Sequence, residues 1–203
     1  MLLPFDELDN IITKWTMPYL DLAVIDKDVL KDELIDDVYE LLVLALVYGQ
    51  TNVNDSLGTD VTLPTATTEG IIFKPIDGKK WDDRIAEYID LIGEDENGKT
   101  ILPEDVIPEI MRVGETETTR VLNEAEQATA DEAQRQTKRT AVKTWRTMED
   151  LRVRETHFFL HGVTIPASDE FWTIDDDHAK TPGGFGKAQN NVNCRCWLEY
   201  GWK

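Results

Sequence analysis

The sequence has only two cysteines, Cys194 and Cys196, among its 203 residues. Two cysteines cannot form the disulfide framework that is typical of small secreted proteins. On an extended strand their Cα atoms would lie about 6.5–7 Å apart, at or beyond the usual limit for a disulfide bond. We therefore expect free thiols unless the backbone bends at this point.

Long hydrophobic runs are also missing. The longest, from Leu41 to Tyr48, has eight residues, whereas a membrane-spanning helix needs about 20. The first ten residues already include acidic side chains and lack the basic start and apolar core of a signal peptide. These absences predict a soluble intracellular product without a membrane partner.

Basic residues are scarce: 21 Lys and Arg stand against 40 Asp and Glu, a net charge of −19. The imbalance is confined to residues 1–137, with 11 basic and 31 acidic residues, because residues 138–203 carry 10 and 9. Such an acidic segment is repelled by duplex phosphates, which argues against nonspecific DNA binding through it. A basic partner surface, or simple solubility, explains the charge better.

The first part of the chain is predicted to be helical. Apolar residues spaced by three and four from Asp28 to Tyr48 predict a helix buried in the core. Residues 51–68 are rich in Thr, Asn, Gly and Pro without a period, which predicts a loop or hinge and a boundary near Gly70. A second helix is expected from about Trp81 to Leu91.

A long helix is predicted next. Pro103 and the two acidic residues after it suit a helix N-terminus, and the helix extends to about Gln136 with a weak point at Gly114. Its second half is polar and rich in alanine, so we expect only a narrow face to be buried.

The last third changes character. Residues 139–146 alternate and predict a strand with Ala141, Lys143 and Trp145 on one face. Thr147 and Asp150 fit a capping box for a helix ending at Gly162, which would place Asp150, Val153, His157 and Leu160 on one stripe.

Short extended pieces are expected within 163–166 and 170–172, turns in 178–191, and a terminal strand in 192–200. On that strand Cys194 and Cys196 share the core face with Leu198. We expect Trp145, Leu160, Phe171 and Cys196 to lie in the core of this part.

The predicted fold class is α+β, with a predominantly helical N-terminal part, a long helix, and a small C-terminal domain of a few strands and one helix. We divide the chain into an acidic helical region, 1–69, a helical connecting region, 70–137, and a C-terminal domain, 138–203.

The order of residues in this last domain resembles that of phage Mu F-like minor head proteins, across about 60 residues. Lys-x-Trp is followed by Asp-x-Arg-x-Arg-x-x-His, a glycine, Asp-Glu-Phe, a Pro-Gly loop and Asn-Cys-Arg-Cys. The matching residues are Lys143, Trp145, Asp150, Arg152, Arg154, His157, Gly162, Asp169, Glu170, Phe171, Pro182, Gly183, Asn193, Cys194, Arg195 and Cys196. The preceding helix, with Arg112, Glu117, Arg120 and Asn123, is similar to the family's upstream helix. Residues 1–70 show no familiar pattern.

This resemblance implies a structural component of the phage head, not an enzyme. It implies a low-copy protein in the virion, associated with the portal vertex, which acts in head morphogenesis or DNA delivery and passes through the host cytoplasm during assembly. The implied partners are the portal protein and other capsid components, with contact to packaged DNA only weakly supported. The pattern residues are assigned structural roles by default.

No cofactor is expected, but zinc is an open alternative. Cys194, Cys196 and His157 or His178 carry suitable donor atoms, although Cys-x-Cys is an unusual zinc spacing. The simpler explanation makes the thiols small buried hydrophobic groups, with His157 beside the strand. In that explanation Arg152, Arg154 and Arg195 pair with Asp150, Asp169 or Glu170.

Two other classes of function remain as alternatives. A toxin-like enzyme module would need a Cys–His nucleophilic pair, which no motif supports. A nucleic-acid-binding module would use the basic concentration of the last third, with Trp145 among the basic residues. Its basic residues are Lys138, Arg139, Lys143, Arg146, Arg152 and Arg154.

Overall fold

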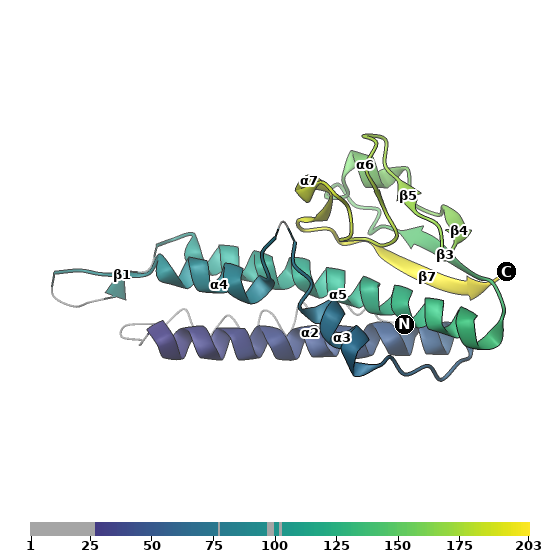
Figure 1. The fold of residues 1–203 in the computed structure, drawn as a ribbon. Helices are drawn as coiled ribbons and strands as arrows, with labels where there is room; N and C mark the ends of the chain where they lie inside the picture. Colours follow the sequence, from purple (N-terminus) through teal and green to yellow (C-terminus); the bar gives the residue numbers. More distant parts are fainter. Residues whose placement is uncertain (1–26, 77, 97–99, 102) are drawn as a thin grey trace.

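The computed structural model describes residues 27–76, 78–96, 100–101 and 103–203 (Figure 1). It is an α+β protein in which two long helices lie side by side and a small sheet-containing module packs against both of them. The main helices are α2 (Lys27–Leu57), α3 (Thr65–Ile72), α4 (Trp81–Asp90) and α5 (Val106–Thr137). In the described part of the chain, no helix is long and apolar enough to cross a membrane.

Helices α2 and α5 run in the same direction. Gly114 lies opposite Val38 near their starts, and Gly49 lies against Leu122 further along. A Cβ atom on Gly49 would be only 2.5 Å from the carbonyl oxygen of Leu122, so the two backbones approach closely here. Helix α4 packs antiparallel to α5 and leads the chain back to the N-terminal end of α5. We call α2 to α5 the helical body.

The predicted loop at 51–68 is partly wrong. Residues 51–57 continue α2, and residues 65–68 begin α3, which contains Gly70 in its interior. Asn54, one of the polar residues that suggested a loop, lies in α2 and binds the chain after it. Its side chain donates a hydrogen bond to the carbonyl of Val61 and accepts one from the amide of Val61. Because Val53 and Leu57 are also buried, tertiary packing outweighs the local preference for a loop. The helix predicted at Trp81–Leu91 is confirmed as α4.

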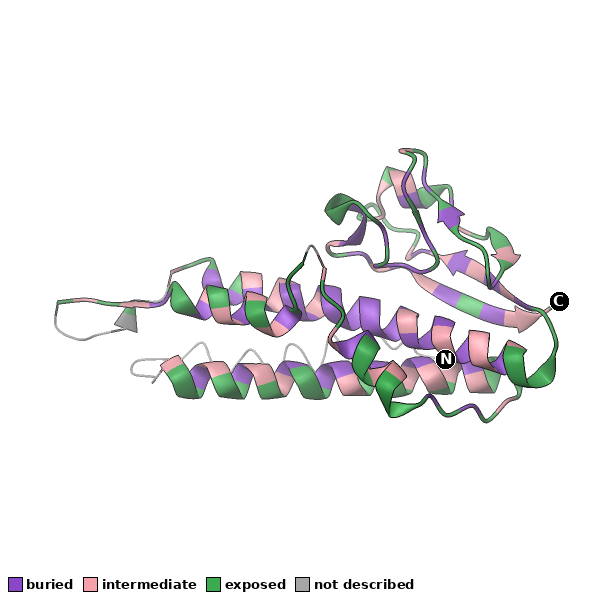
Figure 2. Ribbon diagram, in the orientation of Figure 1, coloured by how far each residue is buried: buried purple, intermediate pink, exposed green. Residues whose placement is uncertain are grey.

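The long helix is confirmed as α5 and runs through Gly114 without a break. The expectation of one narrow buried face is wrong, because every residue from Thr116 to Asn123 is buried. Helices α2 and α4 and the C-terminal module pack against different sides of α5, and Figure 2 shows its middle buried on most sides.

The C-terminal module, residues 138–203, is built on a three-stranded antiparallel sheet. Strand β3 (Ala141–Arg146) lies between β4 (Thr164–Pro166) and β7 (Trp197–Trp202). As predicted, alternate residues of β3 are buried, and so are Leu160, Phe171 and Cys196. The remaining strands have two residues each and form two separate two-stranded sheets. In the module β5 (Phe171–Trp172) pairs with β6 (His178–Ala179), and in the helical body β1 (Gly93–Glu94) pairs with β2 (Thr100–Ile101).

The helix predicted from Thr147 to Gly162 is wrong, because only α6 (Glu155–Phe158) is helical there. The Thr147 hydroxyl contacts Nδ1 of His161 at 3.0 Å, and Asp150 accepts the amide of Arg152 in a local turn. Gly162 does adopt the predicted left-handed conformation, with φ of 78°. A further short helix, α7 (Ala188–Asn191), lies in the predicted turn region. The expected terminal strand begins only at Trp197, so both cysteines precede it.

Candidate functional site

Lys143 is the polar centre of the C-terminal module. Its side chain is fully buried, and Nζ donates to the side-chain oxygen of Gln127 and to the carbonyl of Lys180, both at 2.8 Å. Burial lowers the pKa of Lys143 to about 8, although Asp131 acts in the opposite direction. The lysine thereby joins β3 to α5 and to the loop after β6.

Gln127 connects α5 with the sheet from the other side. It accepts from Lys143 and, at 3.4 Å, from the hydroxyl of Tyr200, while its amide nitrogen donates to the carbonyl of Ala167. Sequence reasoning missed this residue, because a glutamine in a polar helix carries no signal that it is buried. Its hydrogen bonds make α5 an interior element of the module.

Arg120 forms a second buried polar centre in the helical body. Only 1% of it is exposed; it donates to Glu117 at 2.8 Å and to the carbonyl of Ile71 at 2.8 Å. Arg84 donates to the other oxygen of Glu117 at 2.5 Å. Gly183, with φ of 82°, packs so tightly on Arg120 that a Cβ atom would lie 3.1 Å from its Cα. The Pro-Gly loop of the family pattern is thus a contact with α5.

Three buried side chains, His157, Cys194 and Cys196, form what we call the thiol–imidazole cluster. Each sulfur lies 3.6 Å from Nδ1 of His157, and the three donor atoms lie within 4.8 Å of one another. The imidazole stacks on Phe185 with ring centroids 5.2 Å apart and meets the edge of Trp145. The structure therefore brings together all three residues that the sequence suggested as zinc ligands.

The two thiols differ strongly in acidity. A hydrogen bond from Cys196 lowers the pKa of Cys194 well below its usual value, although burial opposes this effect, and His157 lowers it further. The neighbouring Cys194 sulfur and burial raise the pKa of Cys196. The shared proximity therefore favours ionisation of Cys194 over that of Cys196. Both cysteines are free, as expected.

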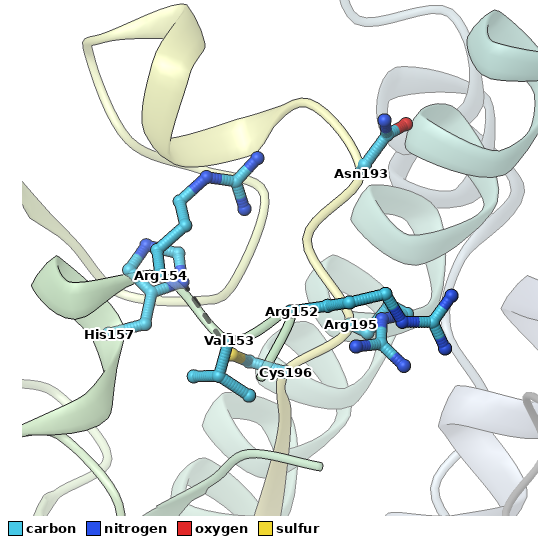
Figure 3. Close-up of a pocket in the computed structure, with 7 residues that line it drawn as sticks. All are labelled: Arg152, Val153, Arg154, His157, Asn193, Arg195 and Cys196. Atoms are coloured by element: carbon cyan, nitrogen blue, oxygen red, sulfur yellow. Dashed lines mark hydrogen bonds between the residues drawn. The ribbon is translucent and has the colours of Figure 1, made fainter. Parts of the chain in front are cut away.

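A small hollow of about 10 Å³ lies beside the cluster (Figure 3). Arg195 at its rim donates to both carboxylate oxygens of Asp150, at 2.7 and 2.8 Å, and this lowers the pKa of Asp150. Arg154 donates to the carbonyl of Val192. The residues that line the hollow are Arg152, Val153, Arg154, His157, Asn193, Arg195 and Cys196.

The predicted ion pairs are only partly correct. Arg195 pairs with Asp150, as expected, and Arg152 lies 3.7 Å from the same carboxylate. Glu170 instead pairs with His178 at 2.9 Å. Asp169, the other predicted partner, accepts a hydrogen bond from the hydroxyl of Ser168.

The remaining motif residues have other roles. Asn193 is exposed and has φ of 53°, so it turns the chain just before Cys194. His178, the other histidine considered for zinc, stacks on Trp172 and is not part of the cluster. Phe171 packs on Trp145 with ring centroids 5.0 Å apart.

The acidic loop around residues 175–178 is organised rather than simply solvated. Asp177 is buried and accepts hydrogen bonds from the amides of Gly186 and Lys187, both at 3.0 Å, and from Asn190 at 2.8 Å. Although burial opposes it, these bonds lower the pKa of Asp177. Its carboxylate fixes the loop that follows β6.

The predicted nucleic-acid surface is incorrect for two of its residues. Lys143 and Trp145 are both fully buried, so neither side chain can contact a base or a phosphate. Arg146 pairs with Glu199, and the guanidinium of Arg139 lies 4.3 Å from the ring centre of Trp202. Arg139 and Arg146 thus have intramolecular partners, but both keep solvent-accessible surface.

The family model described as Phage Mu protein F like protein matches residues 92–199, just over half of the chain. The matched segment contains α5, Lys143 and the whole thiol–imidazole cluster. Neither the curated proteins nor the solved structures contain a match to this chain. On the strength of the family match, the chain belongs to the phage Mu F-like family of head morphogenesis proteins.

Proposed function

We propose that this protein is a minor head protein of a tailed bacteriophage, located at the portal vertex of the virion. There it acts as a structural component, not as an enzyme, in head morphogenesis or DNA delivery, after passing through the host cytoplasm during assembly. The observation that carries the proposal is the family match across residues 92–199.

The interior positions of several pattern residues support a structural role. Lys143 and Trp145 are fully buried, and Gly183 is packed against the backbone of α5. Such positions determine how the module folds on the helical body. These buried residues favour a structural role, whereas Asp150, Arg152 and Asn193 of the same pattern lie at the surface.

Helix α2 offers the surface that best suits a protein partner. Its outer side combines acidic side chains with apolar ones, a composition that favours a basic protein surface over duplex DNA. We assign this surface, called here the α2 surface, to the contact with the portal protein or its capsid neighbours. Its exposed residues include Val29, Asp32, Glu33, Asp36, Tyr39, Glu40, Leu44 and Val47.

The location is tested by comparing cryo-electron microscopy reconstructions of particles made with and without the gene for this chain. We expect difference density at the portal vertex that accommodates the two long helices. Difference density elsewhere on the head, or particles that contain the chain in neither preparation, would contradict the proposed location.

The α2 surface is tested with a charge-reversal variant, Asp32→Lys with Asp36→Lys. We expect at least a tenfold loss of incorporation into particles, since two attractive charge pairs are each replaced by repulsion. The matched control, Glu155→Lys with Asp169→Lys, makes the same charge change on exposed residues of the C-terminal module. Equal incorporation of both variants would exclude α2 as the contact surface.

A further inference from the structure

We propose that His157, Cys194 and Cys196 bind one zinc ion, a site that is independent of the proposed position in the particle. In a tetrahedral zinc site, Zn–S bonds of about 2.3 Å and Zn–N bonds of about 2.0–2.1 Å place sulfur and nitrogen about 3.6 Å apart. Both sulfurs of the cluster lie 3.6 Å from the same nitrogen of His157.

Hydrogen bonding alone does not account for this arrangement equally well. A neutral imidazole nitrogen has a single lone pair or a single proton, so Nδ1 of His157 forms one good hydrogen bond. Two sulfurs at the same distance from it, and three donor atoms within 4.8 Å of one another, instead suit a single central ion. Thiolate and imidazole are the donors that zinc prefers.

The unusual Cys-x-Cys spacing is explained by the backbone. The cysteines precede β7, and the amide of Cys194 donates to the carbonyl of Asn191 at 3.0 Å in a turn. Asn193, with φ of 53°, bends the chain at the same place. The turn and the alternation of side chains direct both sulfurs toward His157, where the aromatic rings of Trp145 and Phe185 hold the imidazole.

The hollow beside the cluster supplies the fourth coordination position. Its volume of about 10 Å³ is close to the space that one water molecule requires. Two thiolates neutralise the charge of the zinc ion, so the filled site adds no net charge beside Arg154 and Arg195. The ion would join the segment around α6 to the segment before β7, which stabilises the module.

The test uses the full chain, stripped with a chelator under reducing conditions, exposed to zinc sulfate and separated from free metal. We expect one zinc ion per chain, and a thiolate-to-metal charge-transfer band when cobalt replaces zinc. X-ray absorption should show two sulfur ligands and one imidazole. Wild-type protein that retains no zinc would overturn the proposal and leave the cluster as hydrogen-bonded thiols.

Variants locate the ion. His157→Gln and Cys194→Ser should lose the metal, whereas the control His178→Gln, which changes a histidine outside the cluster, should keep it. Equal zinc retention by His157→Gln would place the ion elsewhere and overturn the assignment.

Because cluster variants can also misfold, the wild-type chain supplies a second measurement. Zinc should raise its melting temperature and slow alkylation of its thiols by iodoacetamide at least tenfold. Unchanged melting and alkylation would overturn the proposal without reference to any variant.

Discussion

The helical body and the C-terminal module differ in charge balance, although both bury polar side chains. The acidic excess of the chain is confined to residues 1–137, and α2 shows part of it at the surface. In the module, where charges balance, Lys143, His157 and Asp177 are buried and hold neighbouring segments together. Buried polar side chains therefore join elements in both regions, but only the body carries a large acidic excess.

The contrast does not make the two regions independent. One hydrophobic cluster extends from Leu30 in α2 to Tyr200 in β7. The indole of Trp202 donates to the carbonyl of Leu57 at the end of α2, at 2.8 Å. The module therefore folds onto the body as part of the same core.

The largest expected effect concerns the body. Gly49→Ala places a Cβ atom 2.5 Å from the carbonyl oxygen of Leu122, so the backbones of α2 and α5 must separate. We expect a loss of about 2–4 kcal/mol in the free energy of unfolding, measured by denaturant titration.

The matched control is Gly70→Ala, an exposed position inside α3 with no atom within 4 Å of the added Cβ. It should stabilise the protein by about 0.5–1 kcal/mol, because alanine favours the helix. If both variants behave alike, close helix packing does not hold the body together.

The second effect is a pH dependence of stability that arises from Glu126 in the helical body. Burial raises the pKa of Glu126 to about 8, although a hydrogen bond from Asn52 acts to lower it. Because the pKa of Glu126 is higher in the folded protein, its neutral carboxyl group contributes stability. This contribution is complete below the unfolded pKa of about 4.5 and is lost as pH rises toward 8. Between pH 5 and pH 7 the free energy of unfolding of the wild type should fall by on the order of 2–3 kcal/mol.

The Glu126→Gln variant tests this loss, because a neutral amide removes the titration from the core. Its unfolding free energy should change little between pH 5 and pH 7. A wild type and variant with parallel pH profiles would show that Glu126 does not titrate in this range.

The third effect concerns the centre of the module. Lys143→Met keeps most of the length of the side chain but removes Nζ, the donor to the carbonyl of Lys180. We expect a loss of about 1–3 kcal/mol at pH 7, measured by denaturant titration. Because burial lowers the pKa of Lys143 to about 8, the wild type gains stability as pH rises from 8 toward its unfolded value, and the difference between the proteins should widen.

The smallest effect is expected at the surface of the module. Asp150→Asn removes a charge from the pair with Arg195, which is partly open to solvent. Exposed ion pairs contribute little to stability, so we expect a change in melting temperature close to the error of calorimetry. A change as large as that for Lys143→Met would contradict the division between a buried framework and a tolerant surface.

Sequence patterns predicted the elements in which side-chain periodicity agrees with burial. The α2 helix, the continuous α5 and the alternation of β3 belong to this class, and so does the burial of Trp145 and Phe171. Where local preference competes with tertiary contacts, the prediction was wrong. Thr147 has a capping signature but bonds to His161 instead, and residues 51–57 resemble a loop but pack as helix.

The candidate site was predictable in its composition but not in its geometry. His157, Cys194 and Cys196 stand out as chemical types, but their spacing could not show that a turn directs both sulfurs to one nitrogen. Gln127 and Arg120 show the converse, because their burial depends on elements far away in the chain. Contacts between residues that are far apart in sequence leave no local pattern from which they could be predicted.

The order of strands in the main sheet has a consequence for synthesis. Strand β3 occupies the centre, yet its longer partner, β7, is made roughly 60 residues later, since Ala141 pairs with Trp202. Until β7 is synthesised, β3 lacks the partner that pairs with its whole length. The final strand closes the sheet, and through Trp202 it also occupies the end of α2. Strand β7 therefore joins the centre of the sheet to the helical body.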